Sequence, residues 1–238
     1  MTDGDRALDR VAKVGPFFAV RHDPGDPGAE GYTPLAEVHA HPEHALARRV
    51  AAVSATVGAP EPRVAASLVF QGLAARLWSV SLGAAVLTGL RLELDPGLLY
   101  WNPDQMAPDD LWLPRPRGGQ LGRPAEALGH QVVDGHLEPL VRATRSTCRI
   151  AEGLLWGNAA SALAGTLRVL DPWCARHDAG DVRRRAVGLV AELLDRPPLR
   201  GLGEWSDPGR DFRRHSCCLY YRVPGGGLCG DCALAPRR

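Results

Sequence analysis

The C-terminal region of the chain holds four of its six cysteines. They occur as an adjacent pair, Cys217 and Cys218, followed after ten residues by Cys229 and Cys232, which two residues separate. Four thiolates can hold a zinc ion or an iron–sulfur cluster. Structural zinc sites commonly use two Cys-x-x-Cys pairs, whereas adjacent cysteine side chains diverge, and a two-iron cluster accepts more spacings because its terminal positions belong to two metals. The spacing leaves three alternatives: a cluster, a zinc site, or two disulfides.

A glycine-rich turn, residues 224–227, separates the two cysteine pairs. It carries no bulky side chain, so backbone amides can approach the sulfurs of a cluster there. Arg213, Arg214 and Arg222 lie close in sequence. Amide hydrogen bonds and positive charge both stabilise a reduced, more negative cluster, so we expect these features to raise its potential.

Length and composition restrict the class of protein. With 238 residues and 45% hydrophobic content, the chain can bury the core of one domain, with or without an appendage. A net charge of +1 argues against nucleic-acid binding, which requires a basic excess. The most apolar stretch, residues 79–90, is too short to span a membrane, and the acidic N-terminus lacks the basic start of a secretory signal. We therefore expect a cytoplasmic protein with no transmembrane segment, where a reducing environment favours metal ligation over disulfides.

Helical periodicity dominates the pattern of apolar residues. It covers residues 3–14, 43–57, 61–88, 134–148, 150–170 and 181–194. Residues 61–88 are apolar on most sides, which predicts a central helix, with a bend or break near Gly83. Asp171 and Pro172 are expected to end the helix that begins at residue 150.

A change to strict alternation marks the β structure. Residues 90–95 and 98–101 predict two strands joined as a hairpin, and residues 111–113 a third short strand. The fold class is therefore mainly α with a small antiparallel β hairpin or sheet, an α+β architecture with a cysteine-rich metal-binding appendage at its C-terminus. A linker-like stretch, residues 196–209, divides the chain into a helical domain of residues 1–206 and a C-terminal segment of residues 207–238.

Several polar residues outside the cysteine segment receive structural interpretations. Arg76 is interpreted as a member of a salt bridge, and Asn158, in an apolar helix, as a side chain that needs a buried hydrogen-bond partner. His39, His41 and His44 straddle a predicted helix start, and we interpret them as surface histidines rather than as a metal site.

The two remaining cysteines are assigned no metal. Cys148 is interpreted as a buried structural cysteine. Cys174 and His177 are placed in a connecting loop, and no second pair of ligands lies near them in sequence.

The motif Cys-Cys-x10-Cys-x2-Cys at the C-terminal end, after a helical domain, resembles the FhuF-like ferric-siderophore reductases. A weaker likeness lies in residues 155–162, which are similar to a helix in the same family. The resemblance extends over most of the chain, and the N-terminal third adds little to it. It implies that Cys217, Cys218, Cys229 and Cys232 bind a [2Fe-2S] cluster and that residues 1–206 form a siderophore-binding, reductase-like domain.

The function that this resemblance implies is one-electron reduction of Fe(III) in ferric siderophores to Fe(II), which releases the iron because hard oxygen donors hold Fe(II) more weakly. No catalytic residue is assigned beyond the cluster. No Gly-x-Gly-x-x-Gly follows a predicted strand, so we expect an external electron donor, a ferredoxin or a reduced flavin system. The alternatives are a non-catalytic ferric-siderophore binding module with a structural zinc site, and an iron or redox sensor.

Overall fold

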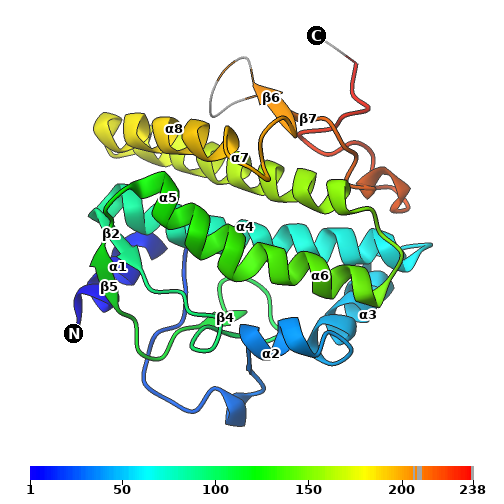
Figure 1. Cartoon of the computed structure of the whole chain (residues 1–238), viewed down its shortest axis with the longest axis horizontal. Coiled ribbons are helices and arrows are strands. Elements are labelled where there is room, and N and C mark those ends of the chain that lie inside the picture. The colour runs from blue at the N-terminus through cyan, green and yellow to red at the C-terminus, as the bar shows by residue number, and fades with distance from the viewer. Residues whose placement is uncertain (206, 208–210, 237–238) are drawn as a thin grey trace.

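A long central helix organises the structure. The computed structural model describes residues 1–205, 207 and 211–236. Helix α4 (Pro62–Thr88) is buried along most of its length because it is apolar on nearly all sides, as predicted. The other long helices pack around it, and Figure 1 shows α7 lying along one side of α4, with α5 and α6 in front.

The remaining helices are mostly those that periodicity predicts. They are α1 (Asp3–Ala12), α2 (Leu35–Ala40), α3 (Ala45–Val57), α5 (Pro124–Leu128), α6 (Glu138–Thr147), α7 (Glu152–Arg176) and α8 (Gly180–Leu194). A π-helical stretch, Gly129–Leu137, joins α5 to α6, and single 3-10 turns form at Gly28–Glu30 and Tyr220–Arg222. The predicted fold class, mainly α with small antiparallel sheets, is confirmed.

Two predicted helix interruptions do not occur. Helix α4 continues through Gly83 without a break, and a Cβ atom there would lie 2.9 Å from the side chains of Phe18 and Val11, so the glycine permits close packing. Helix α7 continues through Pro172 to Arg176. Its last turn is fixed by Trp173, whose indole donates to the Lys13 carbonyl at 3.1 Å.

The strands are short, and two of the described pairs, β1–β3 and β2–β5, join segments distant in sequence. They are β1 (Thr33–Pro34), β2 (Leu90–Leu92), β3 (Tyr100–Trp101), β4 (Leu111–Trp112), β5 (Gly118–Gln120), β6 (Gly203–Trp205) and β7 (Phe212–Arg214). The described strands form three antiparallel sheets, in the orders β1-β3-β4, β2-β5 and β6-β7.

The predicted hairpin between residues 90–95 and 98–101 does not form, because β2 pairs with β5, and β3 pairs with β1 and β4. The residues after β2 form a tight turn, in which the Asp95 carbonyl accepts hydrogen bonds from the amides of Leu98 and Leu99. The fully buried His136 then binds the Leu94 carbonyl through Nε2, at 2.6 Å. The third predicted strand is confirmed as β4.

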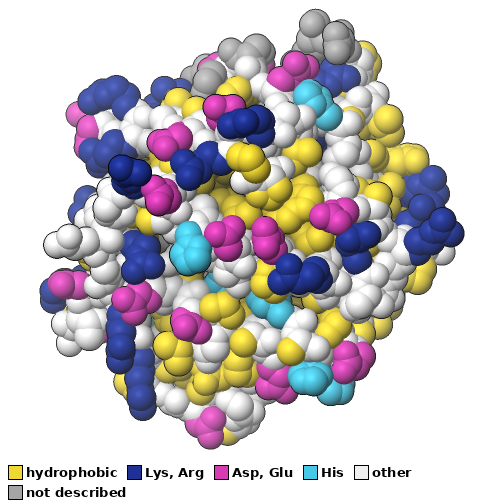
Figure 2. Space-filling model, viewed as in Figure 1, with side chains coloured by type: hydrophobic (Ala, Val, Ile, Leu, Met, Phe, Trp, Pro, Cys, Tyr) yellow, Lys and Arg dark blue, Asp and Glu magenta, His cyan; other side chains and the backbone are white. Residues whose placement is uncertain are grey.

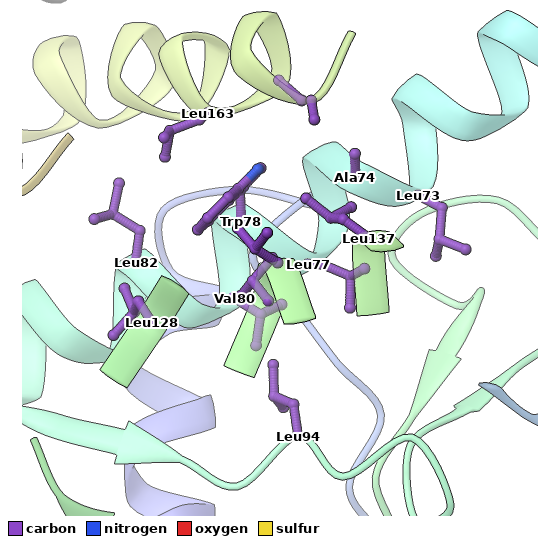
Figure 3. Packing of buried hydrophobic residues seen from close by; sticks show 14 of the residues in the cluster. Leu73, Ala74, Leu77, Trp78, Val80, Leu82, Leu94, Leu128, Leu137 and Leu163 are labelled. Atoms are coloured by element: carbon purple, nitrogen blue, oxygen red, sulfur yellow. The ribbon is translucent and has the colours of Figure 1, made fainter. Parts of the chain in front are cut away.

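Helices α4 and α7 run parallel and share a line of polar contacts inside an otherwise apolar interface. Asn158 lies against Ser67, Ser161 against Gln71, and Thr166 against Ser79, so the residue numbers rise together along the two helices. Apolar side chains fill the space beside this line, and Figure 3 shows Trp78 of α4 between Leu163 of α7 and the residues of the π-helical stretch. The two helices therefore pack together along a shared interface, and other segments can pack against them.

Helix α4 also has the length and composition of a membrane-spanning helix. Among the helices that the structure describes, it is the one that is long and apolar enough to cross a membrane. Inside the protein, 83% of its most apolar 18-residue stretch is buried.

The structural interpretation of Arg76 agrees with its contacts. This arginine is 1% exposed and forms an ion pair with Asp110, with Nε and Oδ1 2.8 Å apart. Its remaining donors bind the carbonyls of Pro16, Phe17, Ala19 and Pro108. Arg76 thus ties the segment after α1 and the loop before β4 to the central helix.

We expect Arg76→Ala to destabilise the fold by about 3–5 kcal/mol, because the change leaves a buried carboxylate and several carbonyls without a partner. Urea denaturation followed by circular dichroism measures the loss. The control is Arg48→Ala, which removes an exposed pair with Asp104 and should leave the midpoint nearly unchanged. Equal midpoints for the two variants would contradict this account of Arg76.

Candidate metal centre

The C-terminal segment reaches α7 through a short hairpin. In the β6–β7 pair Gly203 lies opposite Arg214, and a Cβ at Gly203 would be 2.3 Å from the Phe212 ring, so only glycine fits this close pairing. Figure 1 shows the hairpin and the following loop over α7, with the 3-10 turn near the connection between α3 and α4. An ion pair between Arg222 and Glu61 fastens the loop at that connection. The predicted domain boundary falls between β6 and β7, at residue 206, outside the described residues, and the division into two parts stays a prediction.

The four predicted ligands lie together at this place. Cys218 is 2% exposed and Cys232 5% exposed, whereas Cys217 and Cys229 are half-buried. The Sγ atoms of Cys218 and Cys229 are 3.4 Å apart, so the fold brings the two sequence pairs into contact. None of the six cysteines forms a disulfide. The site is thus closed toward the protein and open on the side of Cys217 and Cys229.

Each thiol faces the backbone amide of the residue two positions later. The donors are Leu219 for Cys217 (3.3 Å), Leu234 for Cys232 (3.4 Å), Tyr220 for Cys218 and Asp231 for Cys229, the last two acting to lower the pKa of their thiols. Amide donors stabilise a thiolate relative to a thiol and stabilise negative charge on a metal-bound sulfur. The backbone is therefore arranged for four sulfurs that carry negative charge.

The contact between Cys218 and Cys229 ties their protonation together. The hydrogen bond between the two sulfurs lowers the pKa of Cys218 and raises the pKa of Cys229, because one proton is shared between them. Burial also raises the pKa of Cys229, and it raises the pKa of Cys217. Metal binding replaces such shared protons, since the ligand is the thiolate.

A buried arginine without a carboxylate partner lies beside the thiols. Arg214 is 1% exposed, and its Nη2 donates to Oδ1 of Asn158. Its Nε and Nη1 are buried and have no partner, as is also true of the Ser216 hydroxyl. A hydrogen bond from the Arg214 side chain, and then its charge, also lower the pKa of Cys218, after the hydrogen bonds from Cys229 and the Tyr220 amide.

These orphaned donors test whether a [2Fe-2S] cluster fits the residues present. Two ferric ions, two sulfides and four thiolates together carry two negative charges, so the group would satisfy buried donors that nothing else in the described residues satisfies. A tetrahedral zinc site instead needs four ligands around one point. No three histidine, cysteine, aspartate or glutamate side chains converge on such a point in the parts of the chain that the structure describes. The residues fit the cluster.

Side chains from α4 and α7 hold the first cysteine pair in place. Asn158 donates through Nδ2 to both the carbonyl and the hydroxyl of Ser67, each at 2.9 Å. The Ser67 hydroxyl in turn donates to the Cys218 carbonyl at 2.7 Å. Asn158 therefore has the buried partners that the sequence analysis required, and one of them leads directly to a predicted ligand.

The second cysteine pair is held through Asp231, which lies between Cys229 and Cys232 and is 4% exposed. Its carboxylate accepts from the Ser161 hydroxyl and forms a two-pronged ion pair with Arg168, both on α7. Its carbonyl accepts from the amide of Arg214 at 3.2 Å. Asp231 thus connects the two halves of the segment to each other and to the helix.

The close approach of the segment to α7 depends on a glycine. A Cβ atom on Gly157 would lie 2.0 Å from the Ser216 hydroxyl and 3.3 Å from the Ser216 Cβ. Ser216 immediately precedes the Cys217–Cys218 pair, so Gly157 leaves the room in which that pair is placed. The small residues of this helix can be read from the sequence and indicate that a neighbouring segment packs closely. They do not identify that segment.

The other residues considered from the sequence lie elsewhere. His41 and His44 are exposed, as expected, and their rings stack at 5.9 Å. His39 is half-buried, and its ring lies 6.0 Å from that of His136, so the surface interpretation is wrong for this residue. Burial lowers the pKa of His39 to about 3, which keeps it neutral.

The remaining two cysteines also differ from expectation. Cys148 is half-buried rather than buried, and its thiol faces the Thr144 carbonyl. Cys174 lies within α7 rather than in a loop, and its side chain belongs to the hydrophobic core. His177, the residue that ends α7, stacks on Trp173 at 4.3 Å.

Comparison with known families agrees with the geometry of the segment. Residues 214–234 match the family model described as the FhuF 2Fe-2S C-terminal domain, a range that contains all four cysteines together with Arg214 and Asp231. The predicted resemblance is confirmed for this segment, and a [2Fe-2S] cluster is its cofactor. No curated protein matches the chain.

We expect Gly157→Ala to impair cluster assembly, because overpacking of this kind costs about 1–3 kcal/mol and displaces Ser216 together with the cysteines that follow it. Iron and acid-labile sulfide per chain measure the effect.

Two variants control this prediction. Gly153→Ala makes the same change one turn earlier in α7, where nothing lies within 4 Å of the added atom, and should keep the full iron content. Adding Ser216→Gly to Gly157→Ala removes both clashing atoms and should restore much of the iron. Full iron content in Gly157→Ala alone would show that the close approach is not required.

Proposed function

We propose that this chain is a cytoplasmic reductase that converts Fe(III) held in ferric siderophores to Fe(II), using a [2Fe-2S] cluster bound by Cys217, Cys218, Cys229 and Cys232. The observation that carries the proposal is that these four thiols lie close together, each facing an amide donor, beside a buried uncompensated arginine. The family match of residues 214–234 supports the cofactor, and its family is linked to ferric-siderophore reduction.

The chemistry requires a one-electron centre that an external molecule can reach. A [2Fe-2S] cluster supplies one electron at a time. One electron turns substrate Fe(III) into Fe(II), which the hard oxygen donors of a siderophore hold far more weakly, so the reduced iron can leave. The chain binds the cluster, excludes water from one side of it and leaves the other side accessible.

The accessible side is the side of Cys217 and Cys229. Exposed apolar side chains belong to the same segment, with Tyr221 42%, Leu228 52% and Leu234 55% exposed. Figure 2 shows hydrophobic side chains at the edge where the C-terminal segment lies in Figure 1, with basic side chains next to them. An apolar rim with basic neighbours suits a bulky, negatively charged chelate, and we place the substrate there.

The buried side is built differently. Ser67, Asn158 and Ser161 of the two parallel helices bind the segment, and Cys218 and Cys232 face them. These contacts exclude water from one half of the centre and fix its distance from the open surface. The electron donor, which we take to be a ferredoxin or a reduced flavin system, must therefore use the same open side as the substrate, at a different time.

We expect serine at any one of Cys217, Cys218, Cys229 or Cys232 to abolish cluster assembly and ferric-siderophore reduction, because an alcohol is a poor ligand for iron at neutral pH. Cys148→Ser, outside the segment, should keep both. The measurements are visible absorption, reduced-state EPR and the iron and sulfide content of anaerobically purified protein, with about two of each per chain expected. Released Fe(II) is trapped by a coloured chelator.

Two results would contradict the proposal. A colourless, zinc-loaded wild-type protein from an iron-replete, anaerobic preparation would favour the binding module with a structural metal. A protein that holds the cluster but does not reduce any ferric chelate of the hydroxamate or catecholate class would retain the cofactor and remove the reductase activity.

A further inference from the structure

Three arginines of the C-terminal segment lie near the cysteines in sequence, but their surroundings differ. Arg213 donates to the carbonyls of Ala233 and Ala235, at 3.1 and 2.8 Å, and so serves to fold the end of the segment. Arg222 is more than one-third exposed and pairs with Glu61. Arg214 is the fully buried one of the three. Its charge is the one that solvent does not screen.

No carboxylate compensates Arg214 among the residues that the structure describes. Its guanidinium binds the neutral amide of Asn158, and two of its nitrogens have no partner at all. The nearby carboxylate of Asp231 is bound by Arg168 and Ser161 instead. Burying an uncompensated guanidinium is costly, so the site is arranged around an anion that the protein side chains alone do not supply.

We propose that Arg214 is the internal counter-ion of the metal centre, oriented by Asn158, and that its charge sets the reduction potential. This inference rests on the proposed [2Fe-2S] centre, and it adds the residue that controls how readily the centre accepts an electron. One electron from the donor raises the negative charge of the centre from two to three, and a fixed positive charge in a dry site stabilises the three-charged state more than the two-charged state. The amides that face the sulfurs act in the same direction.

The identity of residue 158 matters for this role. An asparagine holds Arg214 by hydrogen bonding and leaves its charge uncancelled. An aspartate of the same shape would also bind Arg214, but it would cancel the charge and would place an acceptor against the Ser67 carbonyl, which now accepts from Nδ2. The neutral amide is therefore the choice that preserves the electrostatic effect, while its Nδ2 keeps the contact with Ser67.

The test is an EPR-monitored redox titration of the anaerobic holoprotein with dithionite and mediators, which requires no siderophore. Arg214→Gln should lower the midpoint potential by at least about 59 mV, a tenfold change in a one-electron equilibrium. Arg214→Lys keeps the charge and should remain closer to wild type. Asn158→Asp puts a carboxylate against Arg214, and in cluster-loaded protein it should lower the potential as well. The matched control is Arg222→Gln, which removes an exposed charge from the same segment and should leave the potential nearly unchanged.

The outcomes separate this inference from the proposed function. A wild-type potential in cluster-loaded Arg214→Gln or Asn158→Asp overturns the counter-ion role, whatever the substrate. Loss of the cluster in Arg214→Gln, Arg214→Lys and Asn158→Asp together, with Arg222→Gln intact, shows a purely structural role and overturns it too. If the potentials shift as expected while the wild type reduces no ferric chelate, the counter-ion stands and the reductase assignment fails.

Discussion

The amide of Asn158 is the contact on which the placement of the C-terminal segment depends. Its nitrogen donates to Ser67 on α4 and its oxygen accepts from Arg214 of the segment, while its backbone belongs to α7. One side chain thus joins the two central helices to the cysteine loop. Because it is fully buried, no water can replace a lost partner, and each of the three elements constrains the other two. Residues of the helical body thus help to position the metal centre.

Local patterns were sufficient for some elements and insufficient for others. The helix over residues 61–88 was predictable because its apolar surface on nearly every side needs burial on every side. The hairpin after residue 90 was wrong because alternation predicts a strand but not its partner, and the partner β5 lies beyond two other strands. Pro172 failed to end α7 because Trp173, bound to the carbonyl of Lys13, stabilises the last turn from a distant part of the chain.

The same division applies to the site. The spacing of the four cysteines was enough to predict a metal centre, because thiol ligands close in sequence need few long-range contacts to meet. The residues that support them, Ser67, Ser161 and Arg168, could not be predicted, since they lie on helices far away in sequence and become partners only in the folded protein. Asn158 was an intermediate case. A polar side chain in an apolar helix signals that a buried partner exists, although it does not identify that partner.

Two arginines, one on α7 and one in the C-terminal segment, show how the protein distributes charge around the centre. Arg168 meets the carboxylate of Asp231, so that pair contributes position but little net field. Arg214 meets an amide, so it contributes both position and field. The centre is therefore held by a compensated pair and also faces an uncompensated cation. Asp231 and Arg168 fix position with little net field, whereas a change at Arg214 alters the geometry of the cysteine loop and the electrostatics of the centre together.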